Sequence, residues 1–220
     1  MGKNRGGTPS VLRDLGSEMG YDLQTLPPLA EGPDVVSTTF IKERLKLGEV
    51  RDAARLLGRP YRLSGTVVRG DQRGRTLGFP TANIEVAASI VIPADGIYAT
   101  VATIHSRSGQ PPPVVASPQQ TKRLTTSRVV SAEGSTATPF WEQRYNSVTS
   151  IGMRPTFDGA HRTIETYILD FSADLYGQEI AIDLIERQRA EVRFSSVDDL
   201  VAQMTKDVHI ARDLLAASPK

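Results

Sequence analysis

Hydrophobic residues at helical spacing occupy the first part of the chain. Residues 8–20 begin with a threonine and a proline and end on a glycine, which predicts a capped amphipathic helix. Thr39 is placed to cap a second helix, which would end at Gly48, and residues 49–57 predict a third helix. We therefore expect the segment 1–57 to be a short helical part that precedes another domain.

From Tyr61 onward the hydrophobic period changes from about 3.6 to two, which is typical of strands. Gly, Pro and Asp separate the alternating runs, and no connection leaves room for a long crossover helix. An antiparallel sheet closed into a small barrel is the most economical arrangement. The expected strands are residues 62–69, 96–104, 148–153, 163–171 and 179–186.

One long helix is predicted at the end of the chain. Ser195 or Ser196 can cap it, and its apolar residues fall on one stripe that should pack against the barrel. The stripe comprises Val197, Leu200, Val201, Met204, Val208, Ala211 and Leu215. Residues 106–144, rich in Pro, Ser, Thr and Gln, predict a flexible surface insert within a domain of residues 58–220, with a functional lid as the alternative.

Composition and charge narrow the possible chemistry. The 26 basic and 25 acidic residues give a formal charge of +1, so we expect no nucleic-acid partner. The absence of Cys and the presence of three His exclude disulfides, thiolate catalysis and a His metal cluster. The chain lacks an apolar run of about 18 residues, so we expect no membrane association and a cytoplasmic location.

A segment rich in glycine and arginine runs from residue 65 to residue 83. Glycines let backbone N–H groups approach an anion, and arginines supply forked donors that match phosphate oxygens, so the segment suits a polyphosphate. It contains neither a Walker A sequence nor a Gly-x-Gly-x-x-Gly turn. A solvated hairpin with scattered charges is the alternative interpretation.

Thr81 and Asn83 stand two residues apart after Pro80, at the end of this segment, and in an extended chain their side chains point to the same face. Their neutral oxygens suit Mg²⁺ when phosphate and water complete its coordination. A pair of polar residues in a turn is the alternative.

Glu165 interrupts an otherwise apolar strand. If Glu165 faces the barrel, burying its charge would cost several kcal/mol unless the charge is paired. A role as general base at the barrel mouth would explain why a carboxylate stands there. If the opposite face is the buried one, Glu165 is a solvated surface residue. Residues 187–194 could form a flap over an anion or a ring, or a charged connector.

These segments together resemble the riboflavin kinase module of prokaryotic bifunctional riboflavin kinase/FAD synthetases, from about Gly58 to Leu215. Seven motifs occur in the order of that family. They are Gly65-x-Val67-Val68-x-Gly70, Gly74-Arg75-x-Leu77-Gly78-Phe79-Pro80-Thr81-Ala82-Asn83, Asp95-Gly96-Ile97-Tyr98-Ala99, Ser150-Ile151-Gly152-Met153-Arg154-Pro155-Thr156-Phe157, Ile164-Glu165-x-x-Ile168-Leu169-Asp170-Phe171, Leu175-Tyr176-Gly177 and Arg189-x-Glu191-x-x-Phe194-x-Ser196.

The resemblance implies a mainly β fold, a six-stranded antiparallel Greek-key-like barrel with a C-terminal helix. It implies transfer of the γ-phosphoryl group of Mg²⁺-ATP to the ribityl 5′-hydroxyl of riboflavin, giving FMN and ADP. A monomer is one possibility, and the sequence leaves the oligomeric state open. The resemblance also implies roles for individual residues of this chain. They are Glu165 as catalytic base, Thr81 and Asn83 for Mg²⁺ and ATP phosphate, Gly70 and Arg75 in the phosphate loop, Ile168 and Tyr176 beside the nucleotide, and Arg189, Val192 and Asp199 for the flavin.

Two amino-terminal segments resemble the end of the adenylyltransferase domain that makes FAD in those enzymes. They are Gly2-Lys3-Asn4-Arg5-Gly6-Gly7-Thr8 and Ser37-Thr38-Thr39-Phe40-Ile41-Lys42. The His-x-Gly-His motif of that domain is missing, so we expect no FAD synthesis. The alternatives to the kinase are a catalytically weak flavin-binding module and a partial FAD synthetase.

Overall fold

The computed structural model describes residues 6–106, 141–156 and 159–217. It forms two compact units, Met1–Val36 and Ser37–Lys220, each described here by itself. The expected domain boundary between residues 57 and 58 falls inside the second unit. Most of the predicted insert, residues 107–140, lies outside the described residues, whereas residues 141–144 belong to a strand.

The first unit contains helix α1 (Pro9–Met19) and a small hairpin of β1 (Ala30–Glu31) and β2 (Asp34–Val35). The Thr8 hydroxyl accepts a hydrogen bond from the Val11 N–H at 3.4 Å, and Gly20 ends the helix in the left-handed region with φ 76°. The predicted first helix is thus confirmed. The hairpin was not predicted, because strands of two residues are too short to show alternation.

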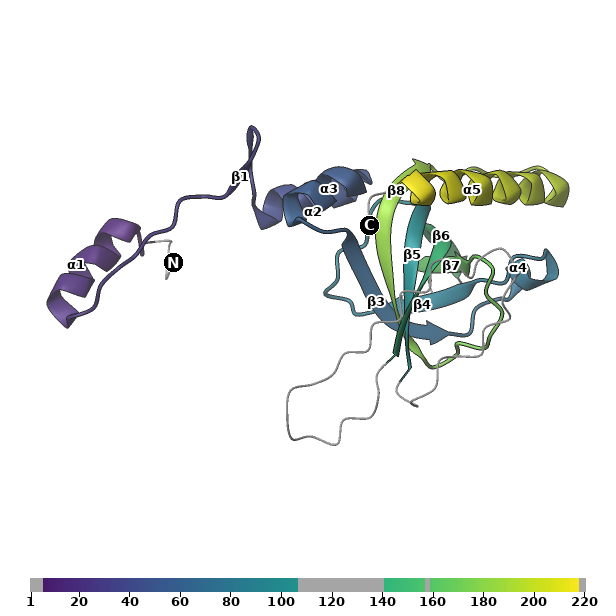
Figure 1. The fold of residues 1–220 in the computed structure, drawn as a ribbon, viewed down its shortest axis with the longest axis horizontal. Helices are drawn as coiled ribbons and strands as arrows, with labels where there is room; N and C mark the ends of the chain where they lie inside the picture. The colour runs from purple at the N-terminus through teal and green to yellow at the C-terminus, as the bar shows by residue number, and fades with distance from the viewer. Residues whose placement is uncertain (1–5, 107–140, 157–158, 218–220) are drawn as a thin grey trace. The chain divides into compact units, whose positions relative to one another are not determined.

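Six strands of the second unit close into a barrel in the order β3-β4-β7-β6-β5-β8, and every neighbouring pair is antiparallel (Figure 1). The barrel expected from the period-two pattern and from the family resemblance is confirmed. The strands are β3 (Tyr61–Val68), β4 (Ala82–Val86), β5 (Gly96–Ser106), β6 (Trp141–Thr156), β7 (Gly159–Ile168) and β8 (Glu179–Arg189).

The strand ends differ from the predicted ones for local reasons. The β7 ladder stops at Ile168 rather than at residue 171, since Asp170 adopts a left-handed backbone with φ 56°. Strand β6 begins at Trp141 because the strand pairs along the whole of β5. The polar sequence at this end of β6 has no alternation, so it did not predict a strand. Strand β4, absent from the predicted strands, carries Asn83 and pairs with both β3 and β7.

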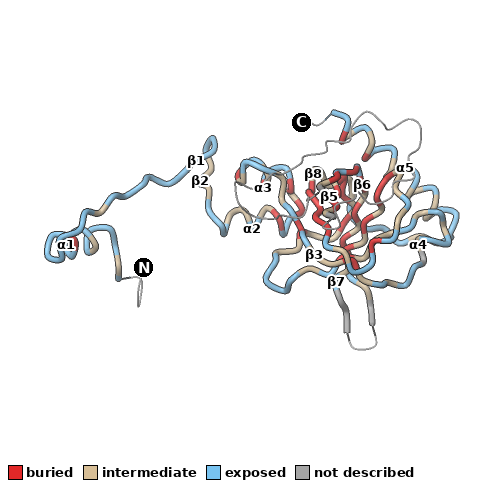
Figure 2. The backbone as a smooth tube through the Cα atoms, turned by 60° about the horizontal axis from the view of Figure 1, so that its bottom comes forward, coloured by how far each residue is buried: buried red, intermediate tan, exposed pale blue. Residues whose placement is uncertain are grey.

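Buried residues gather on the strands of the barrel (Figure 2), and a chain of hydroxyl groups lies among the apolar side chains of its interior. Thr100 bonds Ser147 at 2.7 Å and Thr149 at 2.9 Å, and Thr149 bonds Thr166 at 2.9 Å. All four residues are fully buried, so these bonds satisfy groups that would otherwise be costly inside the protein. The chain links β5, β6 and β7 from within.

Helices α2 (Thr38–Leu47) and α3 (Val50–Leu57) pack with the barrel core, to which Leu45, Val50 and Ala53 contribute buried side chains. The cap of α2 is Ser37, whose hydroxyl accepts from the Phe40 N–H at 3.2 Å, so the prediction of Thr39 as the cap was wrong. The serine stands one turn before the first apolar residues of the helix, which is the position the open N–H groups require.

Helix α5 (Val197–Ala217) lies against the outside of the barrel, as its apolar stripe predicted (Figure 1). Ala211 and Leu215 are buried against Ala99 of β5. The Ser196 hydroxyl accepts from the Asp199 N–H at 3.1 Å, which settles the choice of cap in favour of Ser196. Among the described residues, no helix is long and apolar enough to cross a membrane.

Candidate active site

Glu165 lies on the outer face of the barrel. Its neighbours Ile164, Thr166 and Ile168 are the buried, inward-facing residues of β7. The interpretation of Glu165 as a barrel-facing charge is therefore wrong, and the alternative of an outward position holds. The side chain is nevertheless only 23% exposed, so it is not a fully solvated surface residue either.

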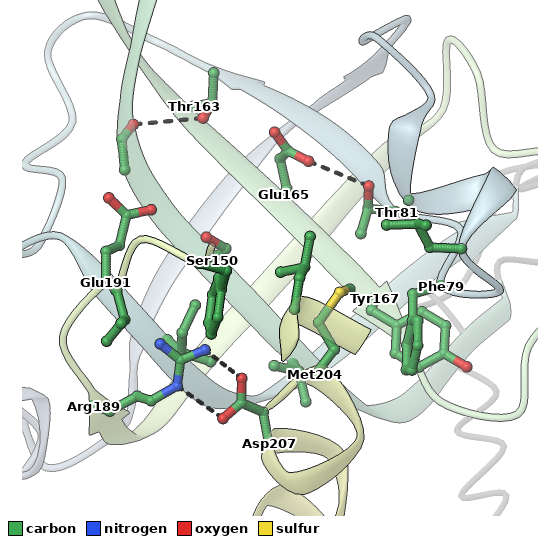
Figure 3. A pocket seen from close by; sticks show the side chains of 18 of the residues that line it. Phe79, Thr81, Ser150, Thr163, Glu165, Tyr167, Arg189, Glu191, Met204 and Asp207 are labelled. Carbon is green, nitrogen blue, oxygen red and sulfur yellow. Dashed lines mark hydrogen bonds and ion pairs between the residues drawn. The ribbon is translucent and has the colours of Figure 1, made fainter. Parts of the chain in front are cut away.

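A pocket of about 810 Å³ opens on this part of the outer surface (Figure 3). It is lined by residues of strands β6 and β7, the first half of α5 and the connector that follows β8. Its wall includes Phe79 and Tyr167, whose rings meet edge to face with centroids 5.3 Å apart. Aromatic and aliphatic walls with a small number of polar groups are typical of a site for a small organic ligand. Polar lining residues include Thr81, Ser150, Arg154, Thr163, Glu165, Arg189 and Glu191.

Two side chains contact the Glu165 carboxylate. The Thr81 hydroxyl donates to Oε2 at 3.4 Å, and Nη2 of Arg154 lies 2.5 Å from Oε1. The other terminal nitrogen of Arg154, Nη1, lies 3.0 Å from Oδ2 of Asp71. The carboxylate is thus held at the edge of the pocket by a hydroxyl and a guanidinium.

Strand register brings the two predicted magnesium ligands beside this carboxylate. Asn83 of β4 is directly opposite Glu165 of β7, and such pairs share one face of a sheet. A side chain on Gly70 would overlap the side-chain amide of Asn83, so glycine is required for this close approach. Gly70, Thr81, Asn83 and Glu165 therefore gather on the outer face of β4 and β7.

A second pocket of about 430 Å³ lies on the other side of Thr81. It is lined by Arg75, predicted in the phosphate loop, and by Ile168 and Tyr176, predicted beside the nucleotide. Arg75 belongs to the short helix α4 (Arg73–Thr76) within the glycine-rich segment. Because Thr81 lines both pockets, it marks the place where they adjoin.

The predicted flavin residues are only partly brought together. Arg189 and Val192 line the larger pocket, but the Arg189 guanidinium binds the buried Asp207 carboxylate at 2.6 and 2.9 Å (Figure 3). Asp199 is not among the residues that line the pocket, and its carboxylate accepts from the hydroxyls of Ser195 and Ser196. These hydrogen bonds lower the pKa of Asp199.

Glu191 is a site residue that sequence reasoning did not single out. Its carboxylate lies against Gly152, where any side chain would overlap it. Loss of hydration, and secondly the nearby charge of Asp95, raise the pKa of Glu191. Its signal in the sequence was the Arg-x-Glu pair of residues 189–191, which composition alone could not separate from a charged connector.

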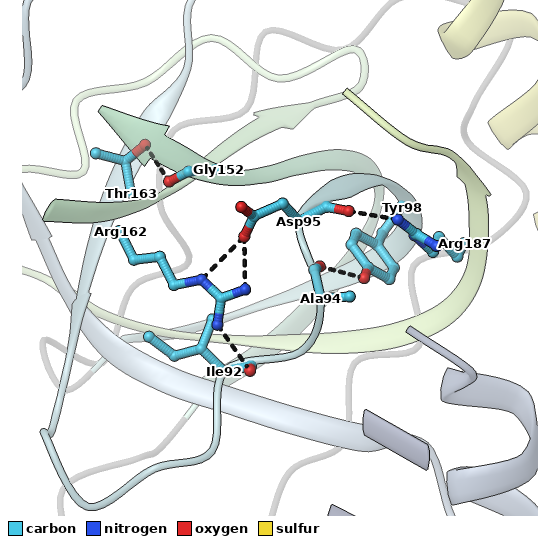
Figure 4. Close-up of polar contacts among 8 residues, drawn as sticks. All are labelled: Ile92, Ala94, Asp95, Tyr98, Gly152, Arg162, Thr163 and Arg187. Carbon is cyan, nitrogen blue, oxygen red and sulfur yellow. Dashed lines mark hydrogen bonds and ion pairs between the residues drawn. The ribbon is translucent and has the colours of Figure 1, made fainter. Parts of the chain in front are cut away.

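Arg162 fixes the chain that leads into β5, next to the pocket (Figure 4). Its guanidinium binds the Asp95 carboxylate at 2.5 and 2.9 Å and the Ile92 carbonyl at 3.1 Å. Nη2 of Arg187 donates to the Asp95 carbonyl at 2.6 Å. Burial raises the pKa of the neighbouring Tyr98, whose hydroxyl donates to the Ala94 carbonyl.

Comparison with known proteins identifies the family of this chain. The family model described as flavokinase, riboflavin kinase, matches residues 57–215. The chain therefore belongs to the riboflavin kinase family.

Its relatives include two-function enzymes. The bifunctional riboflavin kinase/FMN adenylyltransferase of Escherichia coli (strain K12) is 32% identical over 212 residues, which are 96% of this chain and 56% of that protein. The Bacillus subtilis (strain 168) enzyme of the same name is 30% identical over 210 residues, 94% of this chain and 54% of the relative. The chain spans about half the length of the curated relatives it matches.

A solved structure also shares the fold. The crystal structure of a Streptococcus pneumoniae protein described as a macrolide-efflux protein superposes with a TM-score of 0.69 at 30% identity. The match covers 91% of this chain and 54% of that chain.

Proposed function

We propose that this chain is an ATP-dependent riboflavin kinase, which moves the γ-phosphoryl group of ATP to the 5′-hydroxyl of the riboflavin ribityl chain. One observation carries the proposal. The Glu165 carboxylate and the Thr81 hydroxyl, 3.4 Å apart, lie where a large aromatic-walled pocket adjoins a smaller pocket beside the glycine- and arginine-rich segment.

The larger pocket suits riboflavin as the phosphoryl acceptor. Its volume of about 810 Å³ lies in the range common for small-molecule sites, and Phe79, Tyr167 and Met204 offer apolar surface to a flat ring system. A ribityl chain that extends from the ring toward Glu165 would bring its terminal hydroxyl to the junction of the pockets.

The smaller pocket suits the nucleotide. Ile168 and Tyr176 supply surface for a base or sugar, and Arg75 supplies a cation for phosphate. The guanidinium of Arg69 stacks on the Tyr176 ring, 5.1 Å from its centroid, which places a further cation at this edge.

Thr81 and Asn83 fit a magnesium ion. Both present neutral oxygens beside the Glu165 carboxylate, and Mg²⁺ commonly takes one or two protein ligands together with phosphate oxygens and water. When bound, the ion would neutralise charge that develops between the β- and γ-phosphates.

The residues of the chain would then act mainly by orientation. Glu165 would accept the proton of the ribityl hydroxyl as that oxygen bonds to the γ-phosphorus and the bond to the β-phosphate oxygen breaks, leaving FMN and ADP. Thr81 would hold the Glu165 carboxylate in place through the hydrogen bond that its hydroxyl donates to Oε2. Phe79 and the connector after β8 would keep water away from the transferring group.

The test is direct. The purified chain is incubated with riboflavin, ATP and Mg²⁺, and riboflavin, FMN and FAD are separated by chromatography and quantified by fluorescence. We expect FMN without FAD. Binding of riboflavin with no FMN formed would reject the proposal and favour a flavin-binding module. FAD formed beside FMN would show that the kinase also has a partial FAD synthetase activity.

A further inference from the structure

One arginine joins the two halves of the candidate site. Arg154 of β6 binds Glu165 of β7 through Nη2 at 2.5 Å and Asp71 through Nη1 at 3.0 Å. Its side chain is 32% exposed, and those of Glu165 and Asp71 are 23% and 48% exposed. A single guanidinium therefore connects the proposed base with the segment proposed to hold phosphate.

Asp71 belongs to the stretch between β3 and β4, which makes turns rather than strand ladders. The backbone bonds within it are local, such as Phe79 N–H to the Gly74 carbonyl at 2.8 Å and Arg75 N–H to the Gln72 carbonyl at 3.2 Å. Local bonds shape a loop but do not place it relative to a distant strand. The Asp71–Arg154 contact does so near the start of the stretch, because Arg154 is anchored in the β6–β7 ladder, and the Phe79–Tyr167 ring contact does so near its end.

We propose that Arg154 is a positioning residue, which sets the phosphate segment and the Glu165 carboxylate in register across the junction of the two pockets. The inference rests on the proposed kinase activity. The fork of the guanidinium is essential to it, since two separate terminal nitrogens hold the two carboxylates. A lysine ammonium has one nitrogen and can retain only one of these contacts well.

Variants can separate the two contacts. Asp71→Asn removes only the negative charge that pairs the phosphate segment with Arg154. The KM for ATP should then rise about two- to fivefold, which is the effect expected for loss of a partly exposed ion pair, and kcat should change little. Arg154→Gln loses both contacts and should add a fall in kcat of about tenfold or more, because Glu165 loses the charged one of its two orienting partners. Arg154→Lys should recover part of kcat.

If the Asp71–Arg154 contact acts on ATP binding, the double variant should show a specific combination of KM and kcat. In the Asp71→Asn background, Arg154→Gln should cause no further rise in the KM for ATP but should still lower kcat. Arg51→Gln is the matched control, since it also removes one arginine from an ion pair, that with Glu186 between α3 and β8, away from both pockets. The inference is overturned if Arg154→Gln behaves like Arg51→Gln, or if the KM effects of Arg154→Gln and Asp71→Asn multiply.

A second measurement does not depend on turnover. Trypsin cleavage after Arg69 and Arg75 reports how firmly the segment is held, and it should become several-fold faster in Asp71→Asn and Arg154→Gln but not in Arg51→Gln. Equal cleavage rates in all variants with unchanged thermal stability would reject the contact even if the chain makes FMN. A wild-type chain that makes no FMN would instead reject the proposed function.

Discussion

Glu165 is an ionisable residue on the outer face of the barrel, and its neighbours leave only 23% of its side chain exposed to solvent. Its carboxylate contacts are with side chains at the edge of the larger pocket, Thr81 and Arg154, rather than with the barrel interior. Arg154 and Thr81 supply a cation and a donor, which is how a partly buried carboxylate is normally stabilised. The local environment therefore holds Glu165 in place and leaves it within reach of a ligand.

Replacing Glu165 by Gln tests this residue. The amide keeps the shape of the side chain but cannot take a proton from a ribityl hydroxyl, so kcat should fall by about 10²-fold or more with a modest change in the KM for ATP. Steady-state kinetics of FMN formation measure both constants. Near-normal turnover of Glu165→Gln would show that Glu165 is not the base.

At the scale of elements, the joint between β8 and α5 forms one side of the larger pocket. Asp207 of α5 is 3% exposed and binds the Arg189 guanidinium through both of its oxygens. Gln203, one turn earlier on α5, donates to the same carboxylate at 2.9 Å. This network ties the helix to the last strand and sets where the connector between them begins.

Asp207→Ala should destabilise the protein by roughly 3 kcal/mol, because it leaves the Arg189 guanidinium, 20% exposed, without its buried partner. Asp213→Ala is the control, since Asp213 is an exposed aspartate on the same helix and surface changes usually stay within about 0.5 kcal/mol. Urea denaturation followed by circular dichroism measures both. Equal midpoints for the two variants would mean that the network contributes little to stability.

At the scale of the whole molecule, both pockets and the barrel core belong to the unit Ser37–Lys220. The unit Met1–Val36 has few buried residues, and many of its large apolar side chains are exposed, including Met19, Leu26 and Leu29. Among the described residues, all those that line the two pockets belong to the second unit.

Removal of residues 1–36 should leave the melting temperature within a few degrees and the rate of FMN formation within about twofold, because no core residue of the barrel is lost. Ser37 must be retained, since its hydroxyl caps α2. Differential scanning fluorimetry and the FMN assay compare the two chains. A large loss of either property would show that the first unit supports the second.

Several features of the fold could be predicted because they depend on local sequence. Period-two alternation identified five of the six strands, and the stripe from Leu200 to Leu215 identified the packing of α5. Strand β4 was missed since it is short and begins in a segment dominated by Gly and Arg. The candidate site was predicted in part, because Thr81, Asn83 and Glu165 stand in recognisable motifs.

The order of apolar positions, and with it the barrel strands and the terminal helix, is determined by the sequence alone, because strand and helix periods are properties of neighbouring residues. Which face of β7 points inward was decided only by the tertiary structure. Alternation cannot tell the two faces apart when both are covered, one by the core and the other by a pocket wall. The contacts of Arg154 with Asp71 and Glu165 likewise depend on strand order and loop placement, which bring together residues far apart along the chain.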